Sequence, residues 1–306
     1  MSTRVLVVGG TGMIGAHVAT LLAERGDEVT VSSRAEPRAT SPVRGMPHLA
    51  GDYAAGTFTR EQLEPFDAVV FTAGTDTRHV SAEDESEAHW AAAQSDAVPA
   101  FAALARDAGV ARFVQIGSCY HQAMPELAAV HPYVRARQLA DERTRALSSS
   151  AFAAVTLNPP PIVGSIPGPV LRRYERMVDW VRGATDAPPL TAPPGGTNYL
   201  SARSLAQAVA GALDRGVAGT AYLVGDENLS YREFFQLFAD ESESGATIRE
   251  RDEEHPFLMD RYITQGRGRV LAYEPDPAES ALLGYDRGDV RRAVRQIVDE
   301  VDRARG

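Results

Sequence analysis

The beginning of the chain places an apolar run, a glycine-rich turn and a helical pattern next to one another. Four apolar residues, Val5 to Val8, run directly into Gly9-Gly10-Thr11-Gly12-Met13-Ile14-Gly15. Beyond the turn, Val18, Leu21 and Leu22 recur at the spacing of one helical face. The pattern predicts a buried strand, a tight turn and a helix, in that order.

The same alternation of apolar runs and helical patterns continues along most of the chain. Strands are predicted at residues 29–34, 49–53, 66–74, 112–118, 152–157 and 221–225, and helices at residues 88–108, 133–142, 205–213 and 289–303. Pro99 predicts a helix start or a kink within the first of these helices. Strands that alternate with helices form parallel sheets covered on both faces, so we expect an α/β fold with a doubly wound parallel sheet of the Rossmann type.

The glycine turn predicts the ligand of this fold. Glycines allow the backbone to turn sharply and to approach a pyrophosphate, which then lies against the free N–H groups and the positive end of the following helix. A glycine pattern alone is weak evidence, but here it lies between a buried strand and a helix. We therefore expect dinucleotide binding at Gly9, Thr11, Gly12, Met13, Ile14 and Gly15.

The end of the second predicted strand bears on the choice of dinucleotide. An acidic residue that binds the ribose 2′-hydroxyl of NAD is usual there, but this chain has Ser33 and Arg34, with Arg38 close behind. A guanidinium can bind a 2′-phosphate through two hydrogen bonds. The sequence therefore favours NADP(H) over NAD(H), unless Arg34 is only a solvated loop charge.

Asp52 follows the third predicted strand, and its role is open. Its carboxylate could bind the adenine amino group, cap a helix at residues 59–63 or face solvent. The fourth strand ends in the small residues Ala73 and Gly74, which would let the cofactor ribose lie against the backbone. The polar residues 75–84 are predicted to form a loop at the mouth of the site.

Changes in composition along the chain predict its domains. Residues 1–163 form the dinucleotide-binding domain. Residues 164–196, rich in proline and glycine around the amphipathic stretch 170–181, form an insertion over the site. Residues 197–228 return to the first domain, and residues 229–306 form a smaller, mainly helical region that binds substrate.

Composition and charge narrow the class of protein. The chain has 306 residues, of which 44% are hydrophobic and 24% charged, as in ordinary soluble enzymes. Its net charge of −10 argues against nucleic-acid binding, and no apolar run approaches a membrane span. The single cysteine, Cys119, and the lack of a signal peptide indicate a cytoplasmic protein. No cluster of side chains has metal-ligand spacing, so we expect no metal.

Three features together resemble the extended short-chain dehydrogenase/reductase superfamily, which includes NAD-dependent epimerases and dehydratases. They are the spacing of Gly9, Gly12 and Gly15, Ser118 at the end of the fifth predicted strand, and a helix that begins Tyr133-x-x-x-Arg137. The resemblance covers most of the chain and weakens after about residue 250. It completes the set of expected cofactor contacts, which are Gly9, Thr11, Gly12, Met13, Ile14, Gly15, Ser33, Arg34, Arg38, Asp52, Tyr53, Ala73, Gly74, Pro159 and Ile162.

The resemblance also implies a catalytic set of Ser118, Tyr133 and Arg137. In the family, serine and tyrosine hydroxyls bind the substrate oxygen, the tyrosine exchanges the proton, and a lysine holds the ribose and lowers the pKa of the tyrosine. Arg137 occupies the lysine position in a chain that has no lysine at all. Arginine keeps the positive charge but does not relay a proton.

This departure leaves three interpretations open. Arg137 fills the role of the lysine, or proton transfer uses Tyr120, His121 or a water, or the chemistry is lost and the protein only senses NADP(H). The first interpretation predicts an NADP(H)-dependent oxidoreductase that reduces a carbonyl or oxidises an alcohol on a small organic substrate. A nucleotide-sugar epimerase or dehydratase is the enzymatic alternative, and a non-catalytic NADP(H)-binding module is the other. A homodimer through the helix of Tyr133 is common in similar proteins.

Overall fold

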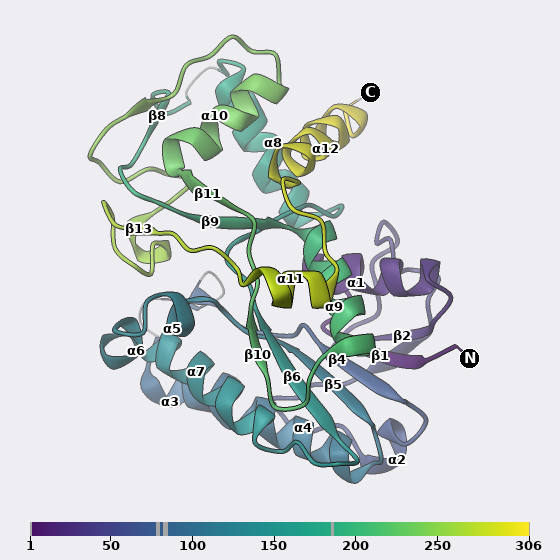
Figure 1. The fold of residues 1–306 in the computed structure, drawn as a ribbon. Coiled ribbons are helices and arrows are strands. Elements are labelled where there is room, and N and C mark those ends of the chain that lie inside the picture. The colour runs from purple at the N-terminus through teal and green to yellow at the C-terminus, as the bar shows by residue number, and fades with distance from the viewer. Residues whose placement is uncertain (1, 78–79, 82–84, 185–186, 306) are drawn as a thin grey trace. The chain divides into compact units, whose positions relative to one another are not determined.

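The computed structural model describes residues 2–77, 80–81, 85–184 and 187–305, and the chain divides into two compact units (Figure 1). Unit 1 comprises residues 1–159, 203–224 and 275–285. Unit 2 comprises residues 160–202, 225–274 and 286–306. The loop predicted at residues 75–84 is described only in part, because residues 78–79 and 82–84 lie outside the described residues.

Unit 1 is built on a seven-stranded sheet in which every neighbouring pair is parallel. The strand order is β10-β6-β5-β4-β1-β2-β3, so the chain winds outward in both directions from β1. This order confirms the predicted doubly wound parallel sheet. The strands are β1 (Arg4–Val8), β2 (Glu28–Ser33), β3 (His48–Ala50), β4 (Ala68–Phe71), β5 (Arg112–Ile116), β6 (Ala153–Asn158) and β10 (Ala221–Leu223).

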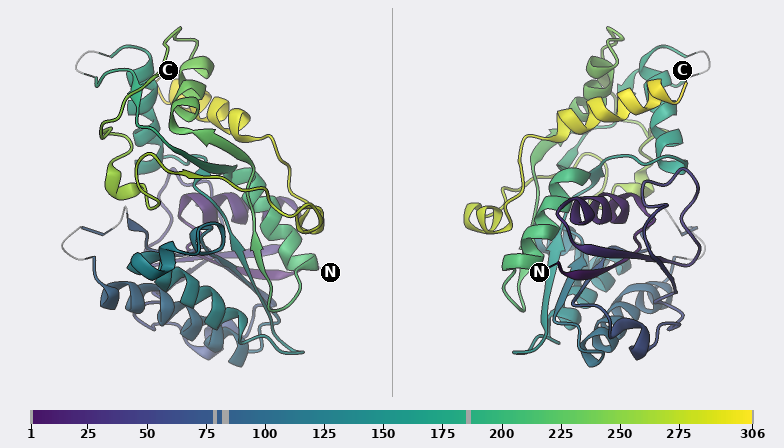
Figure 2. Two further views of the ribbon diagram at one scale, coloured as in Figure 1. Left: turned by 60° about the vertical axis from the view of Figure 1, so that its left-hand side comes forward. Right: turned by 90° about the vertical axis from the view of Figure 1, so that its right-hand side faces the viewer.

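Helices cover both faces of this sheet (Figure 2). The helical elements of unit 1 are α1 (Met13–Glu24), α2 (Arg60–Leu63), α3 (Glu87–Trp90), the π-helical turn η2 (Ala91–Ser95), α4 (Ala97–Asp107), α5 (Tyr120–Ala123), α6 (Leu127–Val130), α7 (Pro132–Arg145), α9 (Ala202–Arg215) and α11 (Pro277–Leu283). On one face α1 lies beside α9, since Arg25 after α1 contacts the carbonyl of Ala210 and the carboxylate of Asp214. On the other face α4 packs on the sheet through a core that joins Phe101 to Leu6 and Phe113.

Two of the expected helical features differ from the structure. The helix expected at residues 88–108 is interrupted, because a π-helical turn at Ala91–Ser95 separates α3 from α4. Pro99 lies in the first turn of α4, where its missing N–H costs no hydrogen bond, so the start expected near this residue is confirmed. The helix at residues 60–63 is capped by Thr59 and Gln62, so the hypothesis that Asp52 caps it is wrong.

Unit 2 combines short strands with three longer helices that enclose their own core. Its elements are β7 (Ile162–Val163), α8 (Pro169–Val181), β8 (Thr191–Ala192), β9 (Gly196–Ser201), β11 (Glu227–Ser230), α10 (Tyr231–Glu241), β12 (Arg249–Glu250), the 3₁₀ turn η3 (Asp260–Tyr262), β13 (Val270–Leu271) and α12 (Val290–Arg303). The inward face predicted for the last helix is confirmed, since Val290, Val294, Ile297, Val298 and Val301 are buried.

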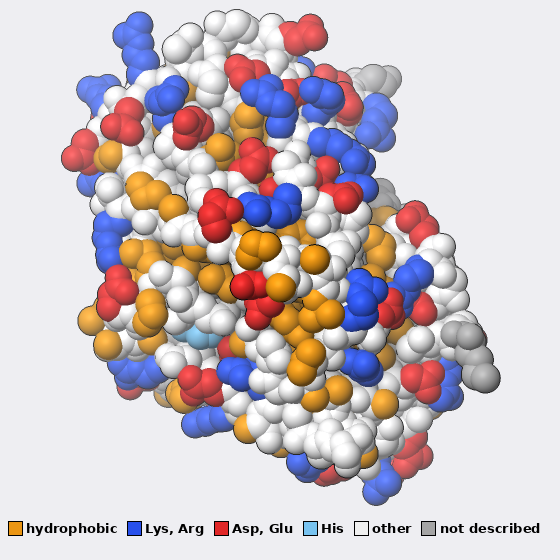
Figure 3. All heavy atoms as spheres, viewed as in Figure 1, with side chains coloured by type: hydrophobic (Ala, Val, Ile, Leu, Met, Phe, Trp, Pro, Cys, Tyr) orange, Lys and Arg blue, Asp and Glu red, His pale blue; other side chains and the backbone are white. Residues whose placement is uncertain are grey.

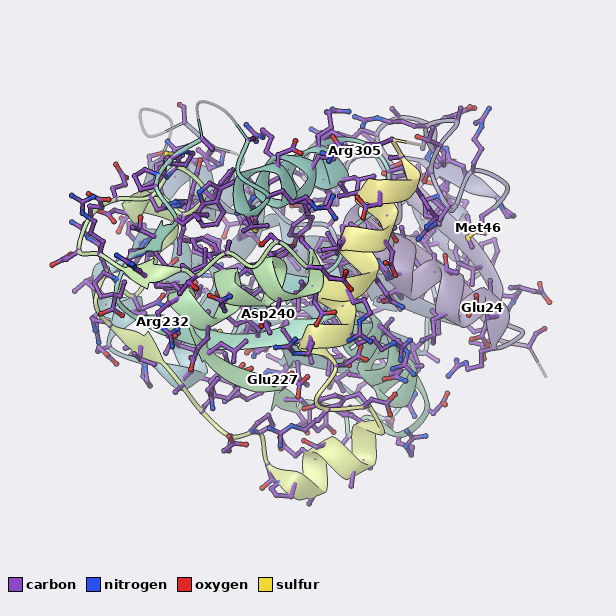
Figure 4. The ribbon with its side chains drawn as sticks, turned by 90° about the horizontal axis from the view of Figure 1, so that it is seen from above. Glu24, Met46, Glu227, Arg232, Asp240 and Arg305 are labelled. Atoms are coloured by element: carbon purple, nitrogen blue, oxygen red, sulfur yellow. The ribbon has the colours of Figure 1, made fainter. Side chains whose placement is uncertain are left out.

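Ion pairs between arginines and acids join neighbouring elements of unit 2. Arg291 of α12 contacts Asp240 and Glu241 of α10, and Arg182 after α8 contacts Asp302 of α12. Figure 4 labels Asp240 on α10 and shows α12 beside it. On the face drawn in Figure 3, basic and acidic side chains are interspersed. No helix of the described chain is both long and apolar enough to cross a membrane.

Candidate active site at the carboxyl edge of the sheet

The glycine turn after β1 is packed so tightly that Gly9, Gly10 and Gly15 each have no room for a Cβ. Gly9 has a φ of +82°, and a Cβ there would lie 2.6 Å from the backbone nitrogen of Ala73. A Cβ on Gly15 would lie 2.3 Å from the carbonyl oxygen of Gly9. Both separations are shorter than carbon contacts allow, so this turn requires glycine at these positions. The turn also contacts the segment after β4 directly.

The turn ends at an open helix N-terminus. Gly12 is the N-cap of α1 and supplies no side chain to bind the first amides. Met13 and Ile14 begin the helix, and amides at such positions have no acceptor within the helix. Gly12 is exposed, and a Cβ there would lie 3.3 Å from the Gly9 oxygen. These donors and the helix dipole suit the pyrophosphate of a dinucleotide.

Two exposed arginines follow β2. The Ser33 hydroxyl donates to the carbonyl of Ala35 and lies 3.0 Å from Nε2 of His48. Arg34 and Arg38 are exposed, and within the described chain no hydrogen bond or ion pair engages the guanidinium of Arg34. No acidic residue ends this strand.

Asp52 and Tyr53 make local contacts after β3. Asp52 accepts hydrogen bonds from the amides of Ala54 and Ala55 at 2.9 and 3.2 Å, so its carboxylate stabilises the turn that follows. The Tyr53 hydroxyl donates to the carbonyl of Ala93 at 3.0 Å. Burial raises the pKa of Tyr53, while the positive charge of Arg137 acts against this shift.

Ser118 follows β5 and is held by its backbone. Its N–H donates to Oδ1 of Asn158, the last residue of β6, at 3.0 Å. A Cβ on the preceding Gly117 would lie 1.8 Å from the same Oδ1, so glycine is required for this approach. Pro159, one of the expected cofactor contacts, follows Asn158 and accepts a hydrogen bond from the N–H of Cys119 at 3.0 Å.

Arg137 reaches from α7 to the ends of β4 and β5. Its Nη2 donates to the carbonyls of Ile116, at 3.0 Å, and of Gly117. Its Nη1 donates to Oε1 of Gln94 at 3.1 Å and lies 3.1 Å from the position of a Cβ on Gly74. The side chain is buried, and its Nε has no partner among the described residues.

Tyr133 lies in the first turn of α7 and is 7% exposed. Its ring meets that of the buried Trp90, and that of His131 lies 6.2 Å away. Burial lowers the pKa of His131, and the nearby Glu85 partly offsets this. Tyr133 lies on the same helix as Arg137, one turn earlier, and these ring contacts fix the position of its phenol.

A buried carboxylate links three further side chains, one of which, Asn158, binds the N–H of Ser118. Asp141 of α7 binds Nε2 of His121 at 3.0 Å and Nε of Arg145 at 2.5 Å. Burial raises the pKa of Asp141, but the hydrogen bonds from His121 and Arg145 outweigh it and lower the pKa to about 2. Asn158 donates from Nδ2 to Gln122 at 2.7 Å and to Asp141 at 3.3 Å.

Sequence reasoning missed Gln94, Asp141 and Asn158. Asp141 lies four residues after Arg137 and eight after Tyr133, so helical spacing could have placed it on the same face. Gln94 and Asn158 carry no comparable signal, because their contacts join segments far apart in the chain. Ile162, an expected cofactor contact, lies in β7 of unit 2, where it pairs with Leu200.

The sequence matches the model of the NAD dependent epimerase/dehydratase family over residues 5–225. That range contains every residue of the expected catalytic set and every expected cofactor contact. A comparison of the sequence with curated proteins gives no match.

Solved structures of similar fold cover almost the whole chain. A UDP-N-acetylglucosamine 4-epimerase from Methanobrevibacter ruminantium M1, in complex with UDP-N-acetylmuramic acid, has a TM-score of 0.75 at 14% identity, with 100% of this chain and 99% of that chain covered. A UDP-glucuronic acid 4-epimerase from Bacillus cereus, in complex with NAD, has a TM-score of 0.74 at 13% identity, with coverage of 99% and 100%. An NAD-dependent NDP-hexosamine 5,6-dehydratase has a TM-score of 0.72 at 16% identity, with coverage of 100% and 99%. At these identities the likeness concerns the fold.

Proposed function

The chain belongs to the NAD dependent epimerase/dehydratase family, and from that premise we propose that it epimerises or dehydrates a nucleotide sugar with Ser118 and Tyr133 at the reacting carbon. Membership makes the chain an NAD-dependent enzyme rather than a module that only senses the cofactor. The nucleotide-sugar substrate and the residue roles are our proposal.

The contacts of Arg137 carry the assignment of these residues to a common site. Arg137 lies beside Gly74, which follows β4, and binds the carbonyl of Gly117, which precedes Ser118. Gly9 of the cofactor turn also packs against Ala73, the residue before Gly74. The helix of Tyr133 is thereby tied to the edge of the sheet where the cofactor turn and Ser118 lie, and ligands of open parallel sheets bind at this edge.

The residues present fit a nicotinamide dinucleotide. The glycine turn has no room for a Cβ at Gly9, Gly10 or Gly15, and it offers amides for the pyrophosphate. Arg137 keeps one buried donor, Nε, without a partner in the described chain, and a ribose hydroxyl could accept from it. When bound, the nicotinamide would supply a reversible acceptor for hydride.

The chain's own residues would supply binding and proton transfer. The Ser118 hydroxyl would donate to or accept from the substrate oxygen and so orient it. Tyr133, as the phenolate, would take the proton of the reacting hydroxyl, and as the phenol it would later return that proton. The permanent charge of Arg137 would favour the phenolate form of Tyr133, without itself exchanging a proton.

The family and the similar folds favour this proposal over a carbonyl reductase. The family is one of epimerases and dehydratases, and the three solved structures described above bear the names of enzymes that act on nucleotide sugars. A carbonyl reductase acting on a small organic substrate remains the second candidate, because the same three side chains could support it.

The choice between NAD and NADP is a separate proposal. The family is NAD-dependent, and a solved structure of similar fold is a complex with NAD. The exposed Arg34 after β2, with no acid at the strand end, supports a preference for NADP(H) in this chain.

The arginine-rich loop of unit 2 is a candidate to hold the diphosphate of a nucleotide sugar, but Arg251, Arg261 and Arg267 already have partners. Arg267 contacts Asp252 and Asp260, and Arg251 contacts Glu253. Arg261 donates to the hydroxyl of Tyr262 and lies over its ring. Diphosphate binding by these side chains would require that they exchange their present partners.

The test is a panel of UDP-sugars incubated with the enzyme and either NAD⁺ or NADP⁺. Products are separated and their masses determined, so that an epimer, with unchanged mass, is distinguished from a dehydrated sugar. Carbonyl compounds with NADPH form the parallel screen. Conversion of a UDP-sugar supports the proposal, whereas turnover of carbonyl compounds alone would replace it with the reductase.

A further inference from the structure

The peptide group that joins Gly117 to Ser118 is held at both ends by side chains. Nη2 of Arg137 donates to its carbonyl oxygen, and Oδ1 of Asn158 accepts from its N–H at 3.0 Å. Arg137 comes from α7 and Asn158 from the end of β6. Both side chains are buried, so water does not compete freely for these bonds.

Each of the two side chains is fixed by a partner of its own. Gln94 accepts from Arg137 through Oε1 and donates from Nε2 to the carbonyl of Thr75 at 2.8 Å. Asn158 donates to Gln122 and to Asp141. Because both of these acceptors face Nδ2 of Asn158, its Oδ1 is left to face Ser118.

Asp141 keeps its negative charge at this place. The His121 ring and the Arg145 guanidinium, both close to it, hold the pKa of Asp141 at about 2 against the effect of burial. An ionised carboxylate accepts strongly from an amide, so it fixes which way the Asn158 amide points.

We propose that Arg137 and Asn158 are positioning residues that fix the peptide before Ser118 and thereby give its hydroxyl a single orientation toward the substrate. This inference rests on the proposed function, in which Ser118 contacts the substrate. Arg137, which stands in the place of the family's lysine, thereby has a positioning task at Ser118. The planar guanidinium makes hydrogen bonds to several acceptors at once, and the ammonium group of a lysine lacks this planar set of donors.

The chain contains its own reporter for this clamp, by which we mean the hold of Arg137 and Asn158 on the peptide group before Ser118. Cys119, the single cysteine, follows Ser118 and is fully buried. Loosening the peptide should expose its thiol to a disulfide reagent in solution, whatever the substrate is. Labelling of the full chain is therefore followed without substrate, at a temperature well below unfolding.

Asn158→Ala should raise the labelling rate of Cys119 by about tenfold, since a buried hydrogen-bond acceptor is lost. Asn198→Ala is the matched control, because Asn198 is equally buried, accepts from the N–H of Asp226 at 2.9 Å and donates to Asn228 at 2.8 Å, all within unit 2. It should lower the melting temperature without a comparable rise in labelling. Equal labelling rates in the two variants would overturn the proposal.

An exchange of the side chains of Asn158 and Asp141 tests their hydrogen bond even where removal of Asn158 prevents folding. Asn158→Asp keeps an acceptor for Ser118 but sets two carboxylates against each other, so labelling should accelerate. Adding Asp141→Asn restores one donor between the two positions and should bring the labelling rate back toward that of the unchanged chain. Failure of this rescue would contradict the role given to Asp141.

Activity on a nucleotide sugar completes the test. Asn158→Ala should lower kcat by about tenfold or more, with little change in KM, because Ser118 is misplaced rather than removed. Faster labelling with unchanged kcat would overturn the proposal. If the unchanged enzyme converts no nucleotide sugar, the proposed function fails, while the labelling contrast still decides whether the clamp exists.

Discussion

The ring of Tyr133 packs edge-on against the ring of Trp90, with centroids 5.0 Å apart and planes at 63°. Trp90 ends α3 and is fully buried, so it offers a rigid wall for the phenol. Edge-to-face contact is a favoured geometry for aromatic rings. The indole therefore restricts the orientation of the one side chain to which we assign proton transfer.

Tyr133→Phe removes the hydroxyl and preserves this ring contact. We expect turnover to fall by about 10²–10⁴-fold, the range for loss of a general acid or base, with cofactor affinity nearly unchanged. Steady-state kinetics and cofactor titration measure the two effects. Undiminished turnover would remove Tyr133 from the mechanism.

Two glycines of the cofactor turn should respond differently to the same substitution. Gly15→Ala places a Cβ 2.3 Å from the Gly9 oxygen and should destabilise the fold by about 1–3 kcal/mol. Gly12→Ala meets the same oxygen at 3.3 Å, at an exposed position, so it should weaken cofactor binding with a smaller loss of stability.

Thermal unfolding and cofactor titration separate these effects, and Gly45→Ala is the control, because a Cβ there meets nothing within 4 Å. If Gly15→Ala and Gly45→Ala were equally stable, the close packing of the turn would be contradicted.

Arg34→Ala tests the preference between the two dinucleotides. If the guanidinium binds a 2′-phosphate, its loss should weaken NADPH by about 1.5–3 kcal/mol, as for a hydrogen bond to a charged group, and leave NADH nearly unaffected. Calorimetric titration with both cofactors gives the difference. Equal losses for NADPH and NADH would reject the assignment.

His255 should make the stability of unit 2 sensitive to acid. Its ring is buried among Trp180, Phe235 and Phe257, with centroid distances of 5.0, 5.3 and 5.5 Å. Burial lowers the pKa of His255 below the 6.5 of an ordinary histidine, although Glu253 nearby acts in the opposite direction.

The unfolded chain therefore binds the proton first as the pH falls. The stability that the neutral His255 ring contributes is fully present above about pH 6.5 and is lost progressively as the pH falls below that value. His255→Gln keeps an acceptor for the Phe257 amide and has no such titration, so its melting temperature should fall less steeply between neutral and acidic pH. Parallel pH profiles for the two proteins would contradict this.

The strands and helices could be predicted from the sequence because the pattern of each element lies within one contiguous stretch of residues. The glycine turn, the parallel strands and the buried face of α12 each follow from spacing that the sequence displays directly. The return of residues 275–285 to unit 1 does not, because it depends on a close approach between α9 and α11. A Cβ on Gly211 of α9 would lie 1.8 Å from the carbonyl oxygen of Leu283.

The candidate site was predictable in part for the same reason. Ser118 and Tyr133 were predicted because each lies at one end of an element that the sequence displays. The hydrogen bonds of Arg137 and Asn158 to one peptide group could not be predicted in this way. Those bonds depend on the alignment of β5 with β6, in which Ile116 pairs with Leu157, and on the packing of α7. Sequence spacing within one element contains neither piece of information.

The stoichiometry between converted sugar and consumed cofactor tests the central claim most directly. A UDP-sugar that the enzyme accepts is followed by proton NMR, while the absorbance of the reduced nicotinamide is recorded in the same sample with cofactor far below substrate. We predict that many sugar molecules are converted for each cofactor molecule, with no net change in the reduced form. One molecule of cofactor oxidised or reduced for each molecule of product would contradict the account.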